Sequence, residues 1–227
     1  ARYGAQRAYR QDDRRNARLM LKVFYAGVNG LTADAVLHTL SDYRLSRLEK
    51  TARPEARAQS LGAELLLIHA VRSVYPVASL PLKITVVEFG KPELCGIGLE
   101  FSLSHSADMA LCAVSNKCVG ADIQLHTAYK AALAERFFTK KEAAAIAQAA
   151  DKDKMFTQTW AVKESYLKLL GTGIHRPLGS FDVKCDNGCF SIDGAPECSV
   201  SVTELGAYTL AVSSLTDEVP EFIEVRL

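Results

Sequence analysis

The sequence predicts an α+β fold built as two lobes of similar size. Segments with strand-like and helix-like patterns alternate in both halves of the 227-residue chain, which is typical of mixed folds. The composition, with 48% hydrophobic and 23% charged residues, is that of a globular protein with a substantial core. A chain of this length forms one large domain or two small ones. We therefore expect an N-terminal lobe, residues 1–117, and a C-terminal lobe, residues 118–227, although no internal repeat is legible in the residues.

The N-terminal lobe opens, after an arginine-rich start, with a β-branched and aromatic segment that favours a strand. Two segments with apolar residues at intervals of three and four favour helices, the first behind the cap residue Thr32 and the second from Pro54. A later strand ends in Gly90, Lys91 and Pro92, a turn signal that contains a lysine. The predicted elements are strand 21–28, helices 32–51 and 54–75, and strands 82–94 and 108–115, with the short segment 101–107 before the last strand.

The C-terminal lobe repeats this mixture of strands and helices. Its predicted elements are strand 118–124, a helix around 139–150, a helix over 154–170, and strands near 181–185, 188–193, 198–205, 208–214 and 222–227.

Charge and hydropathy exclude two classes of partner. The formal net charge of +1 provides no field that would hold nucleic acid, and no stretch has the run of apolar residues that crossing a membrane requires. The arginine-rich residues 1–15 are not followed by the apolar core of a signal peptide. We therefore expect a cytoplasmic protein in which this segment is a solvated arm rather than a binding patch.

Six cysteines occur without a Cys-x-x-Cys pair and at too low a density for a disulfide-stapled secreted domain. We expect reduced thiols. The alternative is a zinc site formed by Cys185, Cys189 and Cys198, but their spacing is poor and no histidine cluster accompanies them.

Asp122 is the first candidate for chemistry. Alternate side chains of a strand share a face, so Gly120, Asp122 and Gln124 point one way and their apolar neighbours the other. A carboxylate buried there costs several kcal/mol unless a cation, a ring of donors or an open cleft compensates it. The alternative is a salt bridge at a strand end.

Glu164 and Lys168 are the second candidate, because they lie one turn apart on the same face of helix 154–170. Taken alone, they are more simply explained as an exposed ion pair that contributes about 0.3 to 0.5 kcal/mol. Asp122 changes this interpretation. Two carboxylates beside a lysine are what a divalent ion and a phosphate ester require, since oxygen ligands suit Mg²⁺ and an ammonium group suits phosphate oxygens.

The third candidate is the segment Phe-Ser-Leu-Ser-His-Ser at 101–106. Ser104, His105 and Asp108 are the residue types of a serine hydrolase, but neighbours in a strand point to opposite faces and no Gly-x-Ser-x-Gly elbow occurs. His105 fits better as a donor to an anion, and the alternative is a histidine satisfied within a loop.

Five segments carry a family resemblance. They are FGKPEL at 89–94, FSLSHS at 101–106, VGADIQ at 119–124, RFFTKKE at 136–142 and WAVKESYLKLLGTGI at 160–174. In this order they resemble the phosphopantetheinyl transferases of the larger, pseudo-dimeric type, which activate surfactin synthetase and related assembly lines. The segments span about the middle third of the chain, and the last one is highly specific.

The resemblance implies a transferase that moves the phosphopantetheine arm of coenzyme A onto a serine hydroxyl of an apo acyl, aryl or peptidyl carrier protein and releases adenosine 3′,5′-bisphosphate. It implies two α/β lobes related by a pseudo-twofold, with coenzyme A and Mg²⁺, or Mn²⁺, in the cleft between them. A metal-dependent phosphohydrolase and a protein that only binds coenzyme A are the alternatives. The sequence does not say whether the carrier serves fatty acid, polyketide or peptide synthesis.

The resemblance also implies roles for individual residues. Asp122 and Glu164 match the metal-binding acids, and Lys168 and Lys91 match lysines that contact the coenzyme A phosphates. Gln124 departs from the pattern, because many members carry a second acid there. An amide oxygen can still coordinate Mg²⁺ or hold a metal-bound water, with lower affinity.

Further positions match the nucleotide side of the site. Ser104 and His105 match positions that contact the 3′-phosphate, and Arg57, or its neighbour Arg53, matches an arginine that does the same. Glu142 matches an acid to which we assign a positional role.

Overall fold

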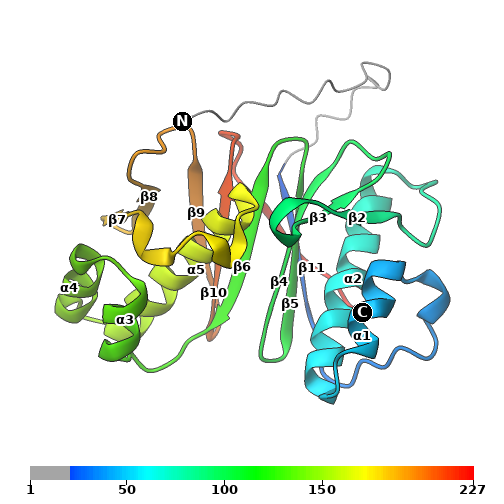
Figure 1. Ribbon diagram of the computed structural model, residues 1–227, viewed down its shortest axis with the longest axis horizontal. Coiled ribbons are helices and arrows are strands. Elements are labelled where there is room, and N and C mark those ends of the chain that lie inside the picture. Colours follow the sequence, from blue (N-terminus) through cyan, green and yellow to red (C-terminus); the bar gives the residue numbers. More distant parts are fainter. Residues whose placement is uncertain (1–20) are drawn as a thin grey trace.

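Two β-sheets lie against each other at the centre of the molecule, and helices cover their outer faces (Figure 1). The computed structural model describes residues 21–227, so the expected solvated arm at residues 1–15 lies outside the described residues. The fold is mixed α+β, as predicted. Within residues 21–227, no helix combines the length and the apolar character needed to cross a membrane.

The first sheet has the strand order β11-β1-β5-β4 and the second the order β6-β10-β9. Their strands are β1 (Lys22–Gly27), β4 (Glu100–Ser106), β5 (Met109–Ser115), β6 (Val119–Leu125), β9 (Ser199–Leu205), β10 (Tyr208–Ser214) and β11 (Glu221–Glu224). Two small antiparallel pairs join β2 (Ile84–Val86) to β3 (Pro92–Leu94) and β7 (Val183–Asp186) to β8 (Cys189–Ile192). Because β11 pairs with β1 in parallel, the end of the chain returns to the first sheet.

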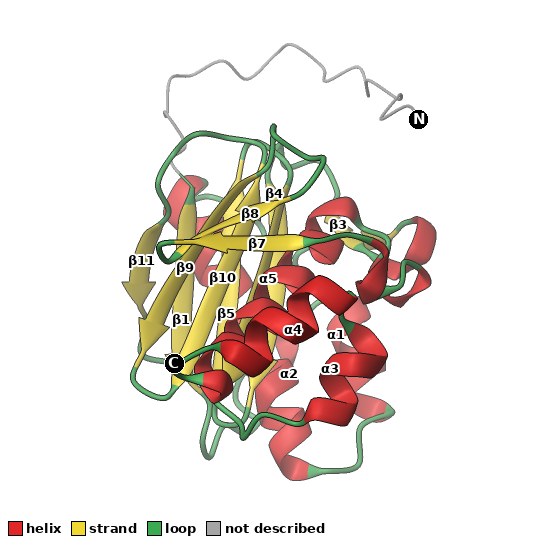
Figure 2. Ribbon diagram, turned by 90° about the vertical axis from the view of Figure 1, so that its left-hand side faces the viewer, coloured by secondary structure: helices red, strands yellow, loops and turns green. Residues whose placement is uncertain are grey.

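The helices lie on opposite sides of this double layer (Figure 1), and Figure 2 shows the molecule turned by 90°, with helices in red and strands in yellow. They are α1 (Asp42–Glu49), α2 (Pro54–Val74), α3 (Ala131–Phe137), α4 (Lys140–Gln148) and α5 (Lys152–Leu170), with 3₁₀ turns at Leu37–Thr39, Glu88–Gly90, Gly173–His175 and Leu178–Ser180. The long helix α2 packs on the first sheet, and α5 packs on β6 and β10 of the second.

Three apolar layers hold the sheets and helices together. One lies between α2 and the first sheet, and another lies between α5 and the second sheet. The third lies between the two sheets. Its buried members are Leu21, Val23, Leu111, Ala113, Val119, Ala121, Ile123, Leu210 and Val212, drawn from both halves of the sequence. This layer follows from the strand period of two, which turns alternate residues of β1, β5, β6 and β10 toward it.

Alternate serines of β4 join it to β6 across the boundary between the sheets. We call these three contacts the serine ladder. They run from the N–H groups of Ala121, Ile123 and Leu125 to the Oγ atoms of Ser102, Ser104 and Ser106, at 2.9, 3.3 and 3.0 Å. The serine hydroxyls thus satisfy backbone donors of β6 that no strand of the first sheet pairs with.

Helix α5 comes unusually close to β6 at Gly120. A Cβ at this position would lie 2.0 Å from the backbone oxygen of Ser165 and 2.2 Å from the backbone nitrogen of Leu169. Only a residue without a side chain allows this approach. The consequence is that the last two turns of α5 lie directly over the strand that carries Asp122.

The predicted helix 32–51 is wrong over its first half, where the structure has only a 3₁₀ turn, and α1 begins at Asp42. Ser41 caps this helix by accepting a hydrogen bond from the Arg44 N–H at 3.2 Å. The Ser41 N–H in turn donates to the buried Glu64 carboxylate at 3.1 Å. This tertiary contact fixes the start of the helix, and the apolar period could not reveal it.

The strand predicted within 82–94 is confirmed only in part, because β2 covers Ile84–Val86 and the chain then turns at Glu88–Gly90 and returns as β3 in a hairpin. The turn between them holds Phe89 at a φ of 60°, a conformation that the sequence does not predict for a phenylalanine. Segment 101–107 forms strand β4, and α3 is an additional helix that the pattern did not predict.

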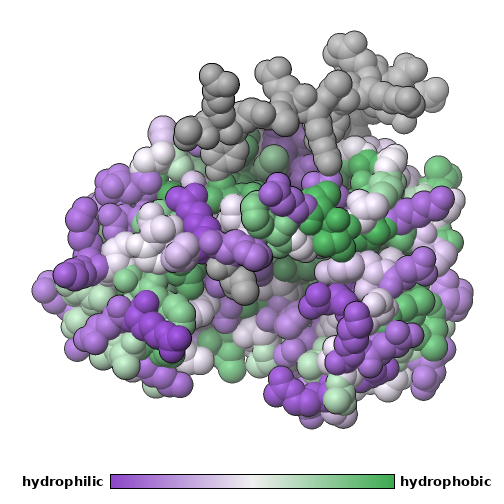
Figure 3. Space-filling model, in the orientation of Figure 1, coloured by the Kyte–Doolittle hydropathy of each residue, from purple (hydrophilic) through white to green (hydrophobic). Residues whose placement is uncertain are grey.

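Hydrophilic side chains cover most of the face shown in Figure 3, and hydrophobic side chains gather above the hairpin of β2 and β3. Val86 and Phe89, 53% and 50% exposed, lie on this hairpin. Phe89 also contacts the His175 ring, with 5.2 Å between ring centroids, so the hairpin touches the segment that follows α5.

Gly120→Ala is expected to destabilise the protein strongly, because the new methyl group can fit only if α5 moves away from β6. Overpacking against backbone should cost about 3 kcal/mol or more, which lowers the melting temperature by roughly 6 to 12 °C. Gly98→Ala is the matched control, because its nearest atom lies 4.0 Å from the new methyl group. Equal melting temperatures for the two variants would disprove the close approach.

Candidate functional site

Asp122 lies at the centre of the candidate site, on the face of β6 that α5 covers. Its side chain is buried, and three donors surround its carboxylate. Oδ1 accepts hydrogen bonds from Ser104 Oγ and from Lys168 Nζ, both at 2.6 Å. Oδ2 accepts one from Gln124 Nε2 at 2.8 Å. A buried carboxylate needs such partners, so the compensation expected from the sequence is present.

The structure brings Glu164 and Lys168 to Asp122 from successive turns of α5. Lys168 makes an ion pair with Asp122 and also donates to the Ala121 carbonyl oxygen at 3.1 Å. Its side chain keeps 28% exposure, so part of it faces solvent. The exposed surface pair that the spacing alone favoured is therefore not what the helix carries, because the lysine pairs with a buried acid of another element.

Glu164 is the second acid of this cluster. Burial raises the pKa of its carboxyl group, the charge of Asp122 raises that pKa further, and Lys168 opposes both effects. The two carboxylates thus repel each other in a partly desolvated environment, with one ammonium group beside them. Such an arrangement favours the arrival of additional positive charge.

Gln124 lies beside Asp122 on the same strand face. Because its amide nitrogen donates to Asp122, its amide oxygen is left to face another partner. Two carboxylates and an amide oxygen are hard oxygen donors, the set that suits Mg²⁺ or Mn²⁺.

Among the described residues, no cluster of three or more His, Cys, Asp or Glu side chains is placed to hold a metal. The zinc alternative at Cys185, Cys189 and Cys198 therefore finds no support there.

Ser104 and His105 lie on opposite faces of β4, as the strand period predicts. Ser104 is buried against Asp122, whereas His105 is exposed. Asp108 is engaged elsewhere, with Tyr208 and Asn29. The three residues do not form a hydrolase triad.

The charges around His105 are mainly positive, and the charge of Asp122 opposes them. The protein atoms that crowd its ring limit hydration and lower its pKa, although the side chain reaches solvent. The charges of Lys168, Arg44 and Arg47 lower this pKa further, in that order. An imidazole held among cations is well placed to donate to an anion.

Lys91 approaches the site from the hairpin side. Its ammonium group contacts the Leu169 carbonyl oxygen at 3.5 Å and the Glu100 carboxylate at 3.8 Å. Gly171, which ends α5 at a φ of 71°, gives it room, since a Cβ there would lie 3.0 Å from the lysine side chain. Lys91 thus lies at the end of the helix that carries Lys168.

Arg57 is not brought to the cluster. Its guanidinium donates to the carbonyl oxygens of Leu48 and Thr51, where it caps the end of α1. Arg53, the alternative, is an exposed residue just before α2. The arginines whose charges reach His105 are Arg44 and Arg47, which sequence reasoning missed. Their spacing of three on one helix was the available signal.

Arg44 is itself a buried cation, because it packs between α1 and α2. It contacts Glu64 at 3.4 Å and donates to Ser60 Oγ at 2.6 Å. Burial lowers its pKa, and the charge of Glu64 opposes that effect. The arginine is therefore fixed in place by α2.

Glu142 and Lys163 form a second, fully buried ion pair at 2.7 Å. Lys163 also donates to the carbonyl oxygens of Leu178 and Phe181, and Glu142 accepts from the Val183 N–H at 2.6 Å. The pair therefore ties α4 and α5 to the loop 178–183.

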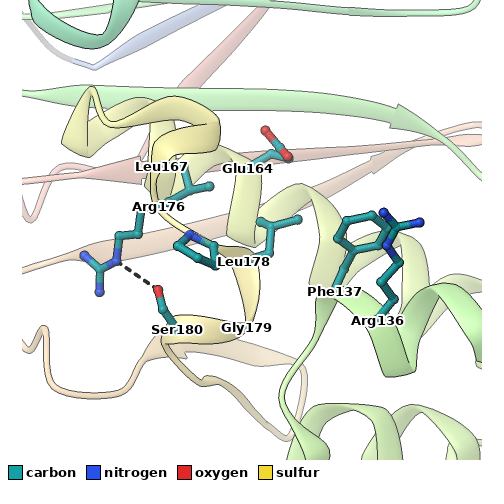
Figure 4. Close-up of a pocket in the computed structure, with 9 residues that line it drawn as sticks. Arg136, Phe137, Glu164, Leu167, Arg176, Leu178, Gly179 and Ser180 are labelled. Atoms are coloured by element: carbon teal, nitrogen blue, oxygen red, sulfur yellow. Dashed lines mark hydrogen bonds between the residues drawn. The ribbon is translucent and has the colours of Figure 1, made fainter.

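That loop borders an open pocket of about 580 Å³ next to the cluster (Figure 4). Glu164 and Leu167 line it from α5, and Arg136 and Phe137 line it from α3. Arg176 lies at the side of the loop, where it donates to Ser180 Oγ at 3.2 Å. The pocket places open space beside one of the two acids.

The chain is similar to known proteins over the region that contains this site. A family model described as the 4′-phosphopantetheinyl transferase superfamily matches residues 118–213, which include Asp122, Glu164 and Lys168. A 4′-phosphopantetheinyl transferase of Bacillus subtilis is 28% identical over 202 residues, 85% of this chain and 90% of the relative. The 4′-phosphopantetheinyl transferase psf-1 of Bacillus pumilus is 32% identical over 182 residues, 75% of this chain and 76% of the relative.

Among solved structures, the holo-(acyl-carrier-protein) synthase of Neisseria meningitidis is similar over 42% of this chain and 94% of its own, with 21% identity. The TM-score is 0.38, so this likeness is too partial to support an inference about the present chain.

Glu164→Gln is expected to stabilise the metal-free protein. Because the folded pKa of Glu164 is raised, its stabilising contribution is present at low pH and is lost as the pH rises through the folded pKa. Gln removes this loss, so the gain should be larger at pH 8 than at pH 4, with about 2 to 4 °C in melting temperature for each kcal/mol. Thermal unfolding with a chelator measures it. Glu135→Gln, at an exposed position, is the control; an equal gain at both pH values would contradict the expectation.

Proposed function

This chain belongs to the 4′-phosphopantetheinyl transferase superfamily, and from that premise we propose that Asp122, Glu164 and Lys168 form its active site. The enzyme transfers the 4′-phosphopantetheine arm of coenzyme A to a serine hydroxyl of an apo carrier protein, and the products are the holo carrier and adenosine 3′,5′-bisphosphate. The observation that carries the assignment is the meeting of two carboxylates and an ammonium group from β6 and α5.

We further propose that residues 1–117 and 118–227 are the two lobes of a pseudo-dimeric enzyme, with the site in the cleft between them. The serine ladder and the apolar layer between the sheets support this division, because both join the two halves of the sequence. The C-terminal strand β11 belongs to the first sheet, so the C-terminal half of the sequence contributes one strand to the sheet of the N-terminal half. A cytoplasmic location and the absence of nucleic acid partners stay predictions.

Asp122, Glu164 and Gln124 offer the oxygen donors that Mg²⁺ or Mn²⁺ would take. When bound, the cation supplies positive charge beside the diphosphate, where negative charge develops as the bisphosphate leaves. The Asp122 side chain is held in place for this role by its three donors. Gln124 contributes no charge, so we expect weaker binding than a third acid would give.

The lysines and His105 would bind the nucleotide. Lys168 lies beside Asp122 with its ammonium group partly open to solvent, and Lys91 lies at the end of the same helix, so both could contact the diphosphate. His105 can donate to the 3′-phosphate among the charges of Arg44 and Arg47. Phosphoryl transfer depends mainly on such placement and charge.

Glu164 is our candidate for the general base. The carrier serine oxygen attacks the β-phosphorus, the bond from this phosphorus to the bridging oxygen breaks, and the bisphosphate leaves with the electron pair. The serine proton passes to the Glu164 carboxylate, a task worth about 10² to 10⁴ in rate. The pocket beside Glu164 provides space for a substrate group at that oxygen.

The carrier is an acyl, aryl or peptidyl carrier protein in this proposal. A phosphohydrolase with the same acids would release its product without a carrier, and a binding protein would give no turnover. The relatives that are 28% and 32% identical are both transferases by name and do not favour these alternatives. Incubation of coenzyme A and Mg²⁺ with and without apo carrier separates all three.

Glu164→Ala and Lys168→Ala are each expected to abolish conversion of an apo carrier to its holo form, because they remove the proton acceptor and the charge beside the diphosphate. Mass spectrometry of a panel of apo carriers should show the gain of one phosphopantetheine group with the wild type only. Thermal unfolding verifies that both variants fold. Full activity in both would refute the assignment of the active site.

Gln124→Glu is expected to lower the Mg²⁺ concentration needed for half-maximal activity by roughly tenfold, because it adds an anionic ligand beside Asp122. The measurement is a Mg²⁺ titration of carrier modification. Gln148→Glu makes the same change of charge at an exposed position of α4 and should leave the titration unchanged. An unaltered titration in Gln124→Glu would remove this residue from the metal site.

A further inference from the structure

Ser104 differs from its two neighbours in the serine ladder. All three serines accept a hydrogen bond from an N–H group of β6, but only Ser104 also contacts a side chain of the candidate site. Its Oγ lies 2.6 Å from Asp122 Oδ1 and 3.3 Å from the backbone nitrogen of Ile123. It therefore bridges the carboxylate of one residue and the backbone of the next.

The directions of these two hydrogen bonds are fixed by the number of protons. Ile123 can only donate through its N–H, so Ser104 Oγ is the acceptor there. The single hydroxyl proton is then given to Asp122, whose ionised carboxylate can only accept. The donating capacity of Ser104 is thus used within the protein, whereas the resemblance implied that it is spent on a phosphate oxygen.

The bridge restricts how the Asp122 carboxylate can turn. Lys168 holds the same oxygen, Oδ1, but through a long and partly exposed side chain. Gln124 holds Oδ2 from two residues along the same strand. Ser104 is the buried partner of the three, on a neighbouring strand. A buried donor with a short side chain fixes geometry better than a flexible one, since fewer rotatable bonds separate it from the backbone.

We propose that Ser104 is a positioning residue, which orients the Asp122 carboxylate for metal binding by clamping it to the backbone of β6. This role rests on the proposed function. Removal of the hydroxyl should free the carboxylate to turn and should weaken the metal site without removing any ligand. Partners of this kind typically account for 10- to 100-fold in metal affinity or activity.

Ser102 provides a matched control. It lies two residues earlier on β4, is 6% exposed like Ser104, and accepts a hydrogen bond from the Ala121 N–H at 2.9 Å. Its other contact is with the Ala121 carbonyl oxygen, to which its hydroxyl donates at 3.5 Å. Loss of either hydroxyl therefore removes one contact of the serine ladder. Only loss of the Ser104 hydroxyl also removes a hydrogen bond to Asp122.

The experiment compares Ser104→Ala and Ser102→Ala with the wild type. Mn²⁺ binding to the carrier-free protein is measured by electron paramagnetic resonance, and the kcat for carrier modification and the KM for coenzyme A are measured at saturating Mg²⁺. Ser104→Ala should weaken Mn²⁺ binding and lower kcat by about 10- to 100-fold. Ser102→Ala should change both by less than threefold, even if the two variants lose equal melting temperature.

Three results would overturn the proposal. Equal losses in both variants would assign Ser104 to the serine ladder alone. A raised KM for coenzyme A with unchanged Mn²⁺ binding would make it the phosphate contact that the resemblance implied. Wild-type behaviour of Ser104→Ala would show that Ser104 has no role in metal binding or in coenzyme A binding.

A graded variant keeps the test decisive if Ser104→Ala does not fold. Ser104→Cys retains most of the volume and donates only weakly, so it should bind Mn²⁺ with intermediate affinity. Wild-type affinity in this variant would contradict the proposal. If the wild type modifies no carrier, the proposed function fails, while the Mn²⁺ comparison still decides the role of Ser104.

Discussion

The close contact of α5 with Gly120 is the constraint on which the site depends. Because β6 presents no side chain there, the helix backbone lies directly on the strand, and the acid two residues later faces the last turns of the helix. A side chain at this position would hold the helix away from the strand. The 2.6 Å contact between Lys168 and Asp122 could not then form without other changes. The geometry of the charges is thus a consequence of backbone packing.

Helix α5 carries charged side chains with different surroundings on its two sides. Lys163 is fully buried, where burial lowers its pKa and Glu142 opposes that effect. It holds the carbonyl oxygens of the loop that borders the pocket. Glu164 is the next residue. The helical rotation turns its side chain toward Asp122 of the second sheet instead. One lysine of this segment therefore shapes the pocket wall, whereas Lys168 pairs with Asp122 in the proposed active site.

The sequence was informative where the relevant contacts are local or follow a period. Asp122 and Glu164 could be found because strand alternation and helical spacing place their side chains without knowledge of the rest of the fold. Arg44 could not, since its nearness to His105 depends on how α1 packs against α2. The serine ladder could not be predicted either, since its partner strand belongs to another sheet and no local pattern indicates such a partner.

The charges of the cluster balance only in part. Asp122 and Glu164 bring two negative charges, and Lys168 neutralises part of them, so the cluster carries a net charge near −1. An acid in place of Gln124 would add a second uncompensated charge within hydrogen-bonding distance of Asp122 and would raise the cost of burying both carboxylates. The amide instead donates to Asp122, which a carboxylate could not do at neutral pH. Gln124 therefore lowers the attraction for a cation and at the same time stabilises the Asp122 carboxylate. The orientation of Asp122 then depends on its surrounding donors, which are Ser104, Gln124 and Lys168.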